Sequence, residues 1–408
     1  MLPTETHFGA QQRRRHGRWQ LEMWIRSLSR GSPMVAPISA ANPVRFSGVF
    51  PRVEPADGNF DLHDFLTTAE ALSNYHSVEE ASEKAGVEIN RAISRGYAVW
   101  FTNWTQVRQR YGDILVSKLA CITKPRSDGT EKARLVVDLR RSGYNSCVVV
   151  EERIVLPRLK DLVEDVLAWQ AGLHPSGAVT FLLADFEDAY HSLGLRDEEV
   201  RYLCVKHPLA GYVVYTTVVF GGAGCTLVWG RAAAFVGRST QSILDPNVGR
   251  LDVYVDDPCV VLAGGETSRR RSATCGLMWW LALGIRISWG KGVYRPQVNW
   301  IGASVDAGQP MQVTVAIPPK YVDELINAIF IVREHDPSVG QLQKIAGKLA
   351  FAACLVPTLW SQAACIWAAM RDTMRAIETI SAQSGRVHKP WLVKTANVSN
   401  KKVRHALE

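Results

Sequence analysis

The chain has 408 residues, of which 47% are hydrophobic and 21% are charged, and its formal net charge is +8. This composition fits a folded protein of two or three domains or one large multi-lobed domain. The positive charge favours an anionic partner such as nucleic acid over a membrane surface. The eight cysteines form no CxxC pair and no zinc-ligand spacing, and the chain has no signal peptide, so we expect reduced thiols and a cytoplasmic or nuclear location.

Two segments raise the questions of disorder and of a membrane span. Residues 1–60 are rich in Arg, Pro, Gly and Ser, and we expect a basic, disordered segment with one short helix near Trp19 to Leu28. The stretch from Leu349 to Met370 is uncharged and long enough to cross a bilayer. It contains Pro357 and several polar residues, so it predicts a buried helical hairpin broken at Pro357 and no membrane association.

The region from Phe60 to Arg141 begins with a helical pattern and ends with strands. The helical pattern runs from Phe60 to Val107. Two apolar strands, Leu119 to Ile122 and Arg134 to Leu139, then flank a polar loop that contains the turn residues Ser127-Asp128-Gly129. The hairpin is rich in Lys and Arg, which suits a phosphate-binding element, although an ordinary solvated hairpin explains the same pattern equally well.

The rest of the chain alternates strands and helices. In chain order we expect a helix over Leu159 to Gln170, a buried strand over Val179 to Ala184, a hairpin over Tyr202 to Val205 and Tyr212 to Val219, a glycine-rich turn opening into a helix, a strand around Leu251 to Val261, a helix over Ala273 to Leu283, two short strands, several helices from Pro318 to Ile380, and a basic tail over residues 386–408.

Three aspartates interrupt or end the predicted strands. Asp256 and Asp257 lie side by side in LDVYVDDPCVV, where a simple hairpin turn is one interpretation. Asp185 directly follows the buried strand AVTFLLA, where an unpaired charge costs several kcal/mol. If the two strands are neighbours in a sheet, the carboxylates converge and offer oxygen ligands to two divalent cations, of which Mg²⁺ suits carboxylate and phosphate ligands best.

The order of the motifs resembles that of the reverse transcriptases. DFEDAY, FGG before a helix, YVDD, a Gly-Lys segment and WIG follow one another as in the palm of that family, and KPRSDGTEKARLVVDLRRSGYN resembles its fingers hairpin. The resemblance covers about residues 107–370 and includes retrotransposon enzymes, among them the tyrosine-recombinase group, as well as retroviral ones. It implies an α+β right-hand polymerase fold with basic residues 1–60, N-terminal helices and fingers over 61–178, a palm over 179–310, a helical thumb or connection over 311–385, and a basic tail over 386–408.

The resemblance also implies a role for each matching residue. It assigns metal binding and catalysis to Asp185, Asp256 and Asp257, with the carbonyl of Phe186 as a further metal ligand and Lys291 as the proton donor to pyrophosphate. It assigns nucleotide binding to Lys124, Arg134, Asp188, Ala189, Tyr190, Phe220 and Gly221, and the primer grip to Trp300, Ile301 and Gly302. The implied cofactors are two Mg²⁺ ions, which Mn²⁺ can replace, and the implied partners are deoxynucleoside triphosphates and an RNA or DNA template with its primer. Tyr190 occupies the position of the ring that excludes a ribose 2′-hydroxyl.

Two features depart from the family pattern. Pro258 follows YVDD and removes one backbone donor from the ladder, and Val219 stands where the family has proline before Phe-Gly. No RNase H, integrase, recombinase or protease motif appears, so we expect the other polyprotein domains to be missing from this chain. The hypotheses are thus an RNA-directed DNA polymerase, a catalytically inactive nucleic-acid-binding relic, and an RNA-dependent RNA polymerase, against which Tyr190 argues.

Overall fold

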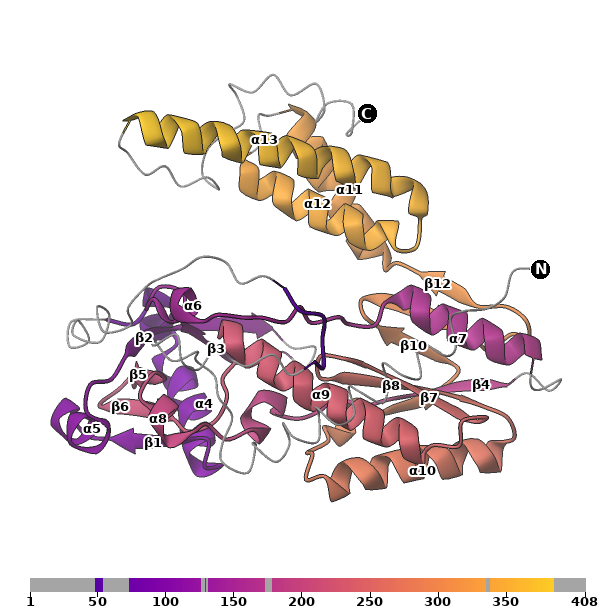
Figure 1. The fold of residues 1–408 in the computed structure, drawn as a ribbon, viewed down its shortest axis with the longest axis horizontal. Coiled ribbons are helices and arrows are strands. Elements are labelled where there is room, and N and C mark those ends of the chain that lie inside the picture. Colours follow the sequence, from indigo (N-terminus) through magenta and orange to yellow (C-terminus); the bar gives the residue numbers. More distant parts are fainter. Residues whose placement is uncertain are drawn as a thin grey trace.

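The structure is a computed structural model that describes residues 48–53, 73–125, 129, 131–172, 178–334 and 338–384. The expected helix near Trp19 and the basic tail lie outside these residues, as does most of the loop around Ser127. The fold mixes α and β elements: three sheets and their covering helices form a body, and a separate unit of three helices stands on it (Figure 1).

A five-stranded sheet forms one end of the body. Its strands are β1 (Ala98–Phe101), β6 (Tyr212–Tyr215), β5 (Cys204–Lys206), β2 (Val116–Pro125) and β3 (Glu131–Asp138), in the order β1-β6-β5-β2-β3. Helices α3 (His76–Glu80), α4 (Ser82–Ser94) and α5 (Trp104–Tyr111) accompany it, with α6 (Tyr144–Cys147) and α8 (Asp197–Val200) in the connections. The β2–β3 hairpin projects from the sheet in a register that pairs Ile122 with Arg134 and Lys124 with Lys132.

A four-stranded sheet of order β7-β8-β4-β9 forms the centre of the body. It contains β7 (Gly249–Tyr254), β8 (Asp257–Ala263), β4 (Val179–Leu183) and β9 (Val293–Arg295). Helices α9 (Ala223–Ile243) and α10 (Glu266–Ala282) cover one face, and α7 (Leu159–Gly172) covers the other. Phe181 therefore packs in the cluster under α7 while Leu182 packs in the core under α9. Burial of both faces explains why β4, apart from Thr180, and β8, after Asp257, consist of apolar residues and do not alternate with polar ones.

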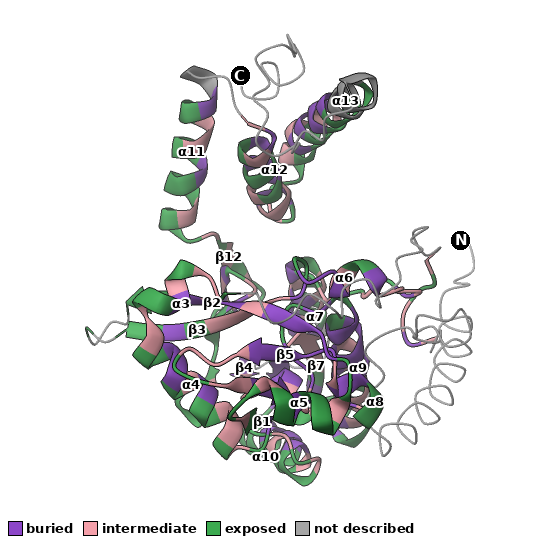
Figure 2. Ribbon diagram, turned by 90° about the vertical axis from the view of Figure 1, so that its left-hand side faces the viewer, coloured by how far each residue is buried: buried purple, intermediate pink, exposed green. Residues whose placement is uncertain are grey.

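The three-stranded sheet joins the body to the helical unit. It comprises β10 (Gln297–Trp300), β11 (Ala303–Asp306) and β12 (Thr314–Ala316), in that order. The unit consists of α11 (Pro319–Glu334), α12 (Val339–Ala353), a 3₁₀ turn η4 (Pro357–Leu359) and α13 (Trp360–Ser384), and it has its own hydrophobic cluster. Ser338 and Gln341 cap α12 reciprocally. The break at Pro357 confirms the predicted helical hairpin, although α11 and α13 keep exposed faces (Figure 2).

Several elements differ from the sequence-based expectation. Strand β1 lies inside the stretch from Phe60 to Val107 that was predicted to be helical, because its partner β6 is more than 100 residues away and local periodicity does not register such pairing. Helix α8 was not predicted, and α10 begins at Glu266 instead of Ala273. Strands β5 and β6, inside the range 179–310 expected for the palm, belong to the same sheet as β1–β3. None of the described helices is long and apolar enough to cross a membrane.

Candidate active site

The β7–β8 hairpin turns at Val255 and Asp256. Tyr254 pairs with Asp257, so only two residues form the turn, and Val255 adopts a φ of 56°, which is rare for a β-branched residue. The indole N–H of Trp229 in α9 donates to the carbonyl of Val255 at 2.9 Å and helps to hold this conformation. The hairpin interpretation of Asp256-Asp257 is thus confirmed, and the turn projects both aspartates from the end of the sheet.

Strand β4 lies beside β8, as the site hypothesis requires. The ladder pairs Leu183 with Cys259, and beyond it the N–H of Phe186 donates to the carbonyl of Asp256 at 3.1 Å. Asp185 therefore follows β4 at the same edge of the sheet as Asp256. On its other side, the carbonyl of Asp185 accepts from the N–H of Ser288 at 2.9 Å.

Pro258 lies in a central strand and not at a sheet edge. Its carbonyl accepts from the N–H of Ala184 at 3.3 Å, but proline has no N–H to return the bond. The position without a backbone N–H lies near the end of the β4–β8 ladder, next to the β7–β8 turn. Pro258 is buried and leaves the β7–β8 register intact.

Lys291 is the cation nearest to the aspartates in the described structure. It ends the 3₁₀ turn η3 (Trp289–Lys291), and its Nζ lies 2.5 Å from Oδ1 of Asp185. The Lys291 side chain is 60% exposed, whereas the Asp185 side chain is 19% exposed. The two groups thus meet at the surface of the site, with Asp185 on the buried side.

Burial and neighbouring negative charge make Asp256 and Asp257 harder to ionise. Loss of hydration and the charge of Asp185 raise the pKa of Asp256, while Lys291 and Arg134 oppose this shift. Loss of hydration and the charges of Asp256 and Asp185 raise the pKa of Asp257 to about 6. A site that concentrates negative charge in this way favours a bound cation.

The donor set suits a hard divalent cation, but the side chains are not gathered around one point. The three carboxylates are hard oxygen ligands, as is the carbonyl of Phe186, and such ligands match Mg²⁺ or Mn²⁺. Among the described residues, no three His, Cys, Asp or Glu side chains are close enough together to hold a metal ion. Lys291 pairs with Oδ1 of Asp185, so a cation at that oxygen would have to displace the ammonium.

A pair of aromatic rings in edge-to-face contact lies beside the carboxylates. Tyr190, buried in the 3₁₀ turn η2 (Ala189–Ser192), meets the ring of Phe220 edge-on with centroids 5.3 Å apart. The guanidinium of Arg134 lies over the ring of Phe220, 4.9 Å from its centroid. Arg134 is also close enough to lower the pKa of Asp256. Tyr190, Phe220 and Arg134 are therefore brought together next to Asp256.

The glycine-rich loop before α9 is held by a residue that sequence reasoning missed. The Asn145 side chain donates to the carbonyl of Gly221 at 3.1 Å and accepts from the N–H of Ala223 at 2.9 Å. Gly221 has a φ of 105°, and a Cβ there would lie 3.3 Å from the carbonyl oxygen of Val137 in β3. The loop thus requires glycine and fixes Phe220 against the hairpin.

Asp188 has partners that sequence reasoning also missed. Its backbone is left-handed, with a φ of 52°, and its carboxylate forms ion pairs with Arg91 of α4 and with Arg95, which caps the end of that helix. Tyr97 bridges the same group, because its hydroxyl lies 3.3 Å from Asp188 and accepts from Arg286 at 2.6 Å. These contacts tie the end of α4 to the loop that carries Asp188 and Ala189, the predicted backbone donors. In the sequence, only the four-residue spacing of Arg91 and Arg95 indicates that both side chains can reach one group.

The segment predicted as the primer grip forms the β10–β11 turn. Ile301 and Gly302 have φ values of 49° and 79°, and Trp300 pairs with Ala303. The buried Trp300 donates its indole N–H to the carbonyl of Asp257 at 3.1 Å, so this turn touches the aspartate hairpin. Lys124 is exposed on the β2–β3 hairpin, on the same face as Arg134, and within the described residues it forms no hydrogen bond or ion pair with another site residue.

The chain resembles solved structures, whereas its sequence matches no known family. No protein-family model matches the chain, and no curated protein matches its sequence. Two solved structures of a foamy viral protease-reverse transcriptase, one in complex with an RNA/DNA hybrid and a dRH form in complex with double-stranded DNA, are similar with TM-scores of 0.47 and 0.48 at 14% identity. Each match covers 88% of this chain, which spans 39% and 51% of those chains. The activity of this chain therefore has to be inferred from its own residues.

Proposed function

We propose that the chain is an RNA-directed DNA polymerase of retroelement origin that adds deoxynucleotides to a primer 3′-hydroxyl. The observation that carries the proposal is the position of Asp185 and Asp256 at one edge of the sheet, with Phe186 hydrogen-bonded to Asp256 between them. In this proposal the five-stranded sheet with α3–α5 is the fingers, the four-stranded sheet with α9 and α10 is the palm, and α11–α13 form the thumb.

Asp185, Asp256 and Asp257, with the carbonyl of Phe186, would hold the divalent cations. Bound there, two Mg²⁺ ions would lower the pKa of the primer hydroxyl and offset the charge that develops on the transferred phosphate. Phosphoryl transfer then requires positioning and charge neutralisation from the protein rather than a covalent intermediate. The raised pKa of Asp256 fits a group that becomes fully ionised as a cation binds.

The remaining site residues would position the nucleotide. Arg134 would leave the face of Phe220 to form charge-assisted hydrogen bonds with the β- and γ-phosphates. The ring of Tyr190, fixed by Phe220 and Trp229, would lie where a ribose 2′-hydroxyl would otherwise fit. Lys291, released from Asp185, would donate a proton to the leaving pyrophosphate oxygen.

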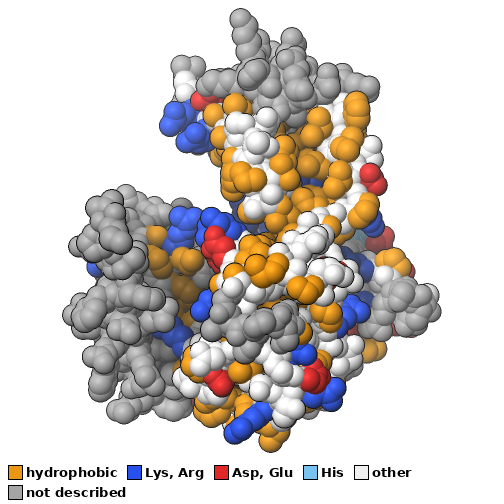
Figure 3. Space-filling view, turned by 90° about the vertical axis from the view of Figure 1, so that its right-hand side faces the viewer, with side chains coloured by type: hydrophobic (Ala, Val, Ile, Leu, Met, Phe, Trp, Pro, Cys, Tyr) orange, Lys and Arg blue, Asp and Glu red, His pale blue; other side chains and the backbone are white. Residues whose placement is uncertain are grey.

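A template-primer duplex is the proposed partner. The chain is basic overall, and Figure 3 shows a notch between the helical unit and the body with Lys and Arg side chains on both sides of it. The contact between Trp300 and Asp257 would couple the primer-binding turn to the carboxylates.

Primer extension tests the proposal directly. Purified protein is given an RNA template, a DNA primer and deoxynucleotides, with Mg²⁺, with Mn²⁺ or with a chelator. We expect extension in both metals and none with the chelator. Binding of the duplex without extension in either metal would instead support the inactive relic, which the lost backbone donor at Pro258 and the Lys291–Asp185 pair favour. Preferential use of ribonucleotides would support an RNA-dependent RNA polymerase.

A further inference from the structure

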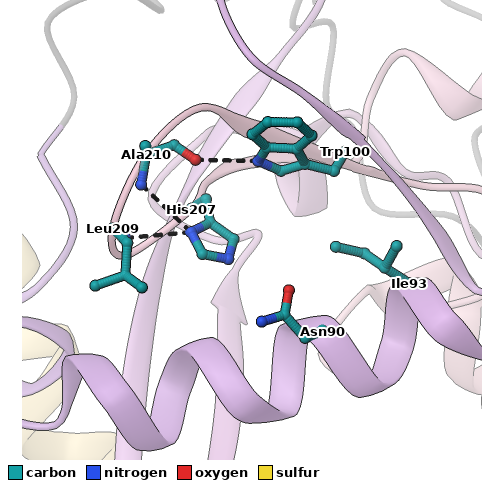
Figure 4. A pocket seen from close by; sticks show the side chains of 6 residues that line it. All are labelled: Asn90, Ile93, Trp100, His207, Leu209 and Ala210. Carbon is teal, nitrogen blue, oxygen red and sulfur yellow. Dashed lines mark hydrogen bonds between the residues drawn. The ribbon is translucent and has the colours of Figure 1, made fainter.

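A pocket of about 330 Å³ lies beside α4, and none of the residues that line it belongs to the candidate active site. It is lined by Asn90 and Ile93 of α4, Trp100 of β1, and His207, Leu209 and Ala210 of the β5–β6 turn (Figure 4). Its volume is at the lower end of the range for small-molecule sites. Asn90 immediately precedes Arg91, which reaches Asp188, so the pocket and the candidate active site flank the same turn of one helix.

The β5–β6 turn is built to close on Trp100. The N–H of His207 donates to the carbonyl of Gly211 at 3.0 Å, and His207 Nδ1 accepts from the N–H groups of Leu209 at 3.2 Å and Ala210 at 3.4 Å. Gly211 has a φ of 84°, and a Cβ there would lie 2.2 Å from the carbonyl oxygen of Phe101. Only glycine therefore permits this approach, and the shape of the pocket is fixed before any ligand arrives.

Trp100 presents a fixed aromatic face. Its indole N–H donates to the carbonyl of Ala210 at 3.0 Å, which satisfies the one polar atom of the side chain, yet the residue remains 44% exposed. An exposed tryptophan whose N–H is already paired offers its ring for stacking, and every nucleobase has a π-face that can stack on it.

The pocket also holds two polar groups without a partner in the described part of the chain. Because Nδ1 of His207 accepts two hydrogen bonds, the proton of the neutral ring is on Nε2, and burial lowers the pKa of His207, which keeps the ring neutral. Figure 4 shows Nε2 facing the carboxamide of Asn90. The N–H at Nε2 of His207 and the amide NH₂ of Asn90 are donors, and the amide oxygen of Asn90 is an acceptor. This set beside the Trp100 ring suits the edge of a heteroaromatic base.

We propose that this pocket binds an unpaired nucleobase, which stacks on Trp100 and hydrogen-bonds through its edge to His207 and Asn90. The base comes either from a single-stranded template segment or from a free nucleotide. The first source rests on the proposed polymerase function, because only a nucleic-acid-binding protein has a template strand to hold near the site. The second source does not depend on it.

The test compares two DNA duplexes without metal or nucleotides, one blunt and one with a single-stranded 5′ overhang, by fluorescence anisotropy. Trp100→Ala should weaken binding of the overhang duplex roughly 5- to 150-fold and leave the blunt duplex unchanged. Trp100→Phe keeps a stacking ring and should stay within about threefold of the wild type. Trp360→Ala, which removes a comparably exposed tryptophan from α13, is the matched control and should not change the ratio between the two duplexes.

Saturation-transfer NMR with adenosine monophosphate separates the two sources. Contact of this nucleotide with the wild type but not with Trp100→Ala, together with competition against the overhang, assigns the pocket to free nucleotides. An effect on the overhang alone assigns it to the strand. Failure of the wild type to bind either duplex counts against the polymerase proposal only, since the nucleotide arm still tests the pocket. Equal loss on both duplexes, or no loss on either duplex together with no nucleotide contact, would overturn the inference.

Discussion

Nζ of Lys291 lies 2.5 Å from Oδ1 of Asp185, so the ammonium already pairs with the carboxylate that would bind a divalent cation in the proposed site. In that site the ammonium and the metal ion compete for the negative charge of one carboxylate. In the proposed site the pair lowers the affinity for metal by the free energy needed to break it.

Lys291→Met is therefore expected to strengthen Mn²⁺ binding while it slows turnover. Partly exposed ion pairs contribute up to about 1 kcal/mol, so the gain in affinity should be about threefold to fivefold. Electron paramagnetic resonance of free Mn²⁺ measures the affinity directly. Lys320→Met removes an exposed lysine of α11 and serves as the control. Unchanged Mn²⁺ affinity in Lys291→Met would show that the ammonium does not compete with the cation.

Metal affinity should fall as the pH is lowered through about 6. The pKa of Asp257 is raised to about 6 and that of Asp256 is raised as well, so both carboxyls take up protons at a higher pH than an ordinary aspartate, whose pKa is about 4. Protonated carboxyls do not bind the cation, and we expect Mn²⁺ affinity to be about tenfold lower at pH 5 than at pH 7.5. Asp257→Asn should flatten this profile. An equally steep profile in the variant would assign the proton to another group.

Asp252 provides a stability prediction outside the site. Its burial beside Asp165 and Asp161 raises its pKa to about 6, and its Oδ2 has no hydrogen-bond partner among the described residues. Between pH 4 and 6 the folded state binds a proton that the unfolded chain lacks, so ionisation at higher pH destabilises the fold. Asp252→Asn should raise the free energy of unfolding in urea by about 1–2 kcal/mol at pH 7.5 and by almost nothing at pH 4. A gain of the same size at both pH values would contradict this explanation.

Tyr190→Ala is expected to admit ribonucleotides. Removing the ring opens the space beside Phe220 and Trp229, and discrimination of this steric kind is worth about 10- to 200-fold. The ratio of kcat/KM for ribo- and deoxynucleotides measures the effect, with circular dichroism to verify folding of a variant that loses a buried ring. Tyr190→Phe keeps the ring and should keep the selection. Unchanged sugar selection in Tyr190→Ala would exclude this role for the side chain.

Local sequence patterns identified the elements around the site but not the contacts between them. The apolar run before Asp185 and the Asp-Pro signal at Asp256 are local, and both the strand and the turn appear where they were predicted. The pairing of Lys291 with Asp185 joins residues 106 apart, and the pairing of Arg95 with Asp188 joins residues 93 apart. Such contacts depend on tertiary packing, which periodicity does not encode. The left-handed backbone at Val255 was equally unpredictable, because Trp229 of a distant helix helps to hold it.

The most direct test of the proposed chemistry is primer extension by Asp185→Asn on an RNA template with Mg²⁺. The substitution keeps the shape of the side chain but removes its charge, and Asp113→Asn, which neutralises an exposed carboxylate paired with Arg108, is the matched control. We predict that Asp185→Asn loses extension by a factor of at least about 10³ while it still binds the template-primer duplex, and that Asp113→Asn extends normally. Undiminished extension by Asp185→Asn would contradict the proposed role of this carboxylate and, with it, the polymerase site.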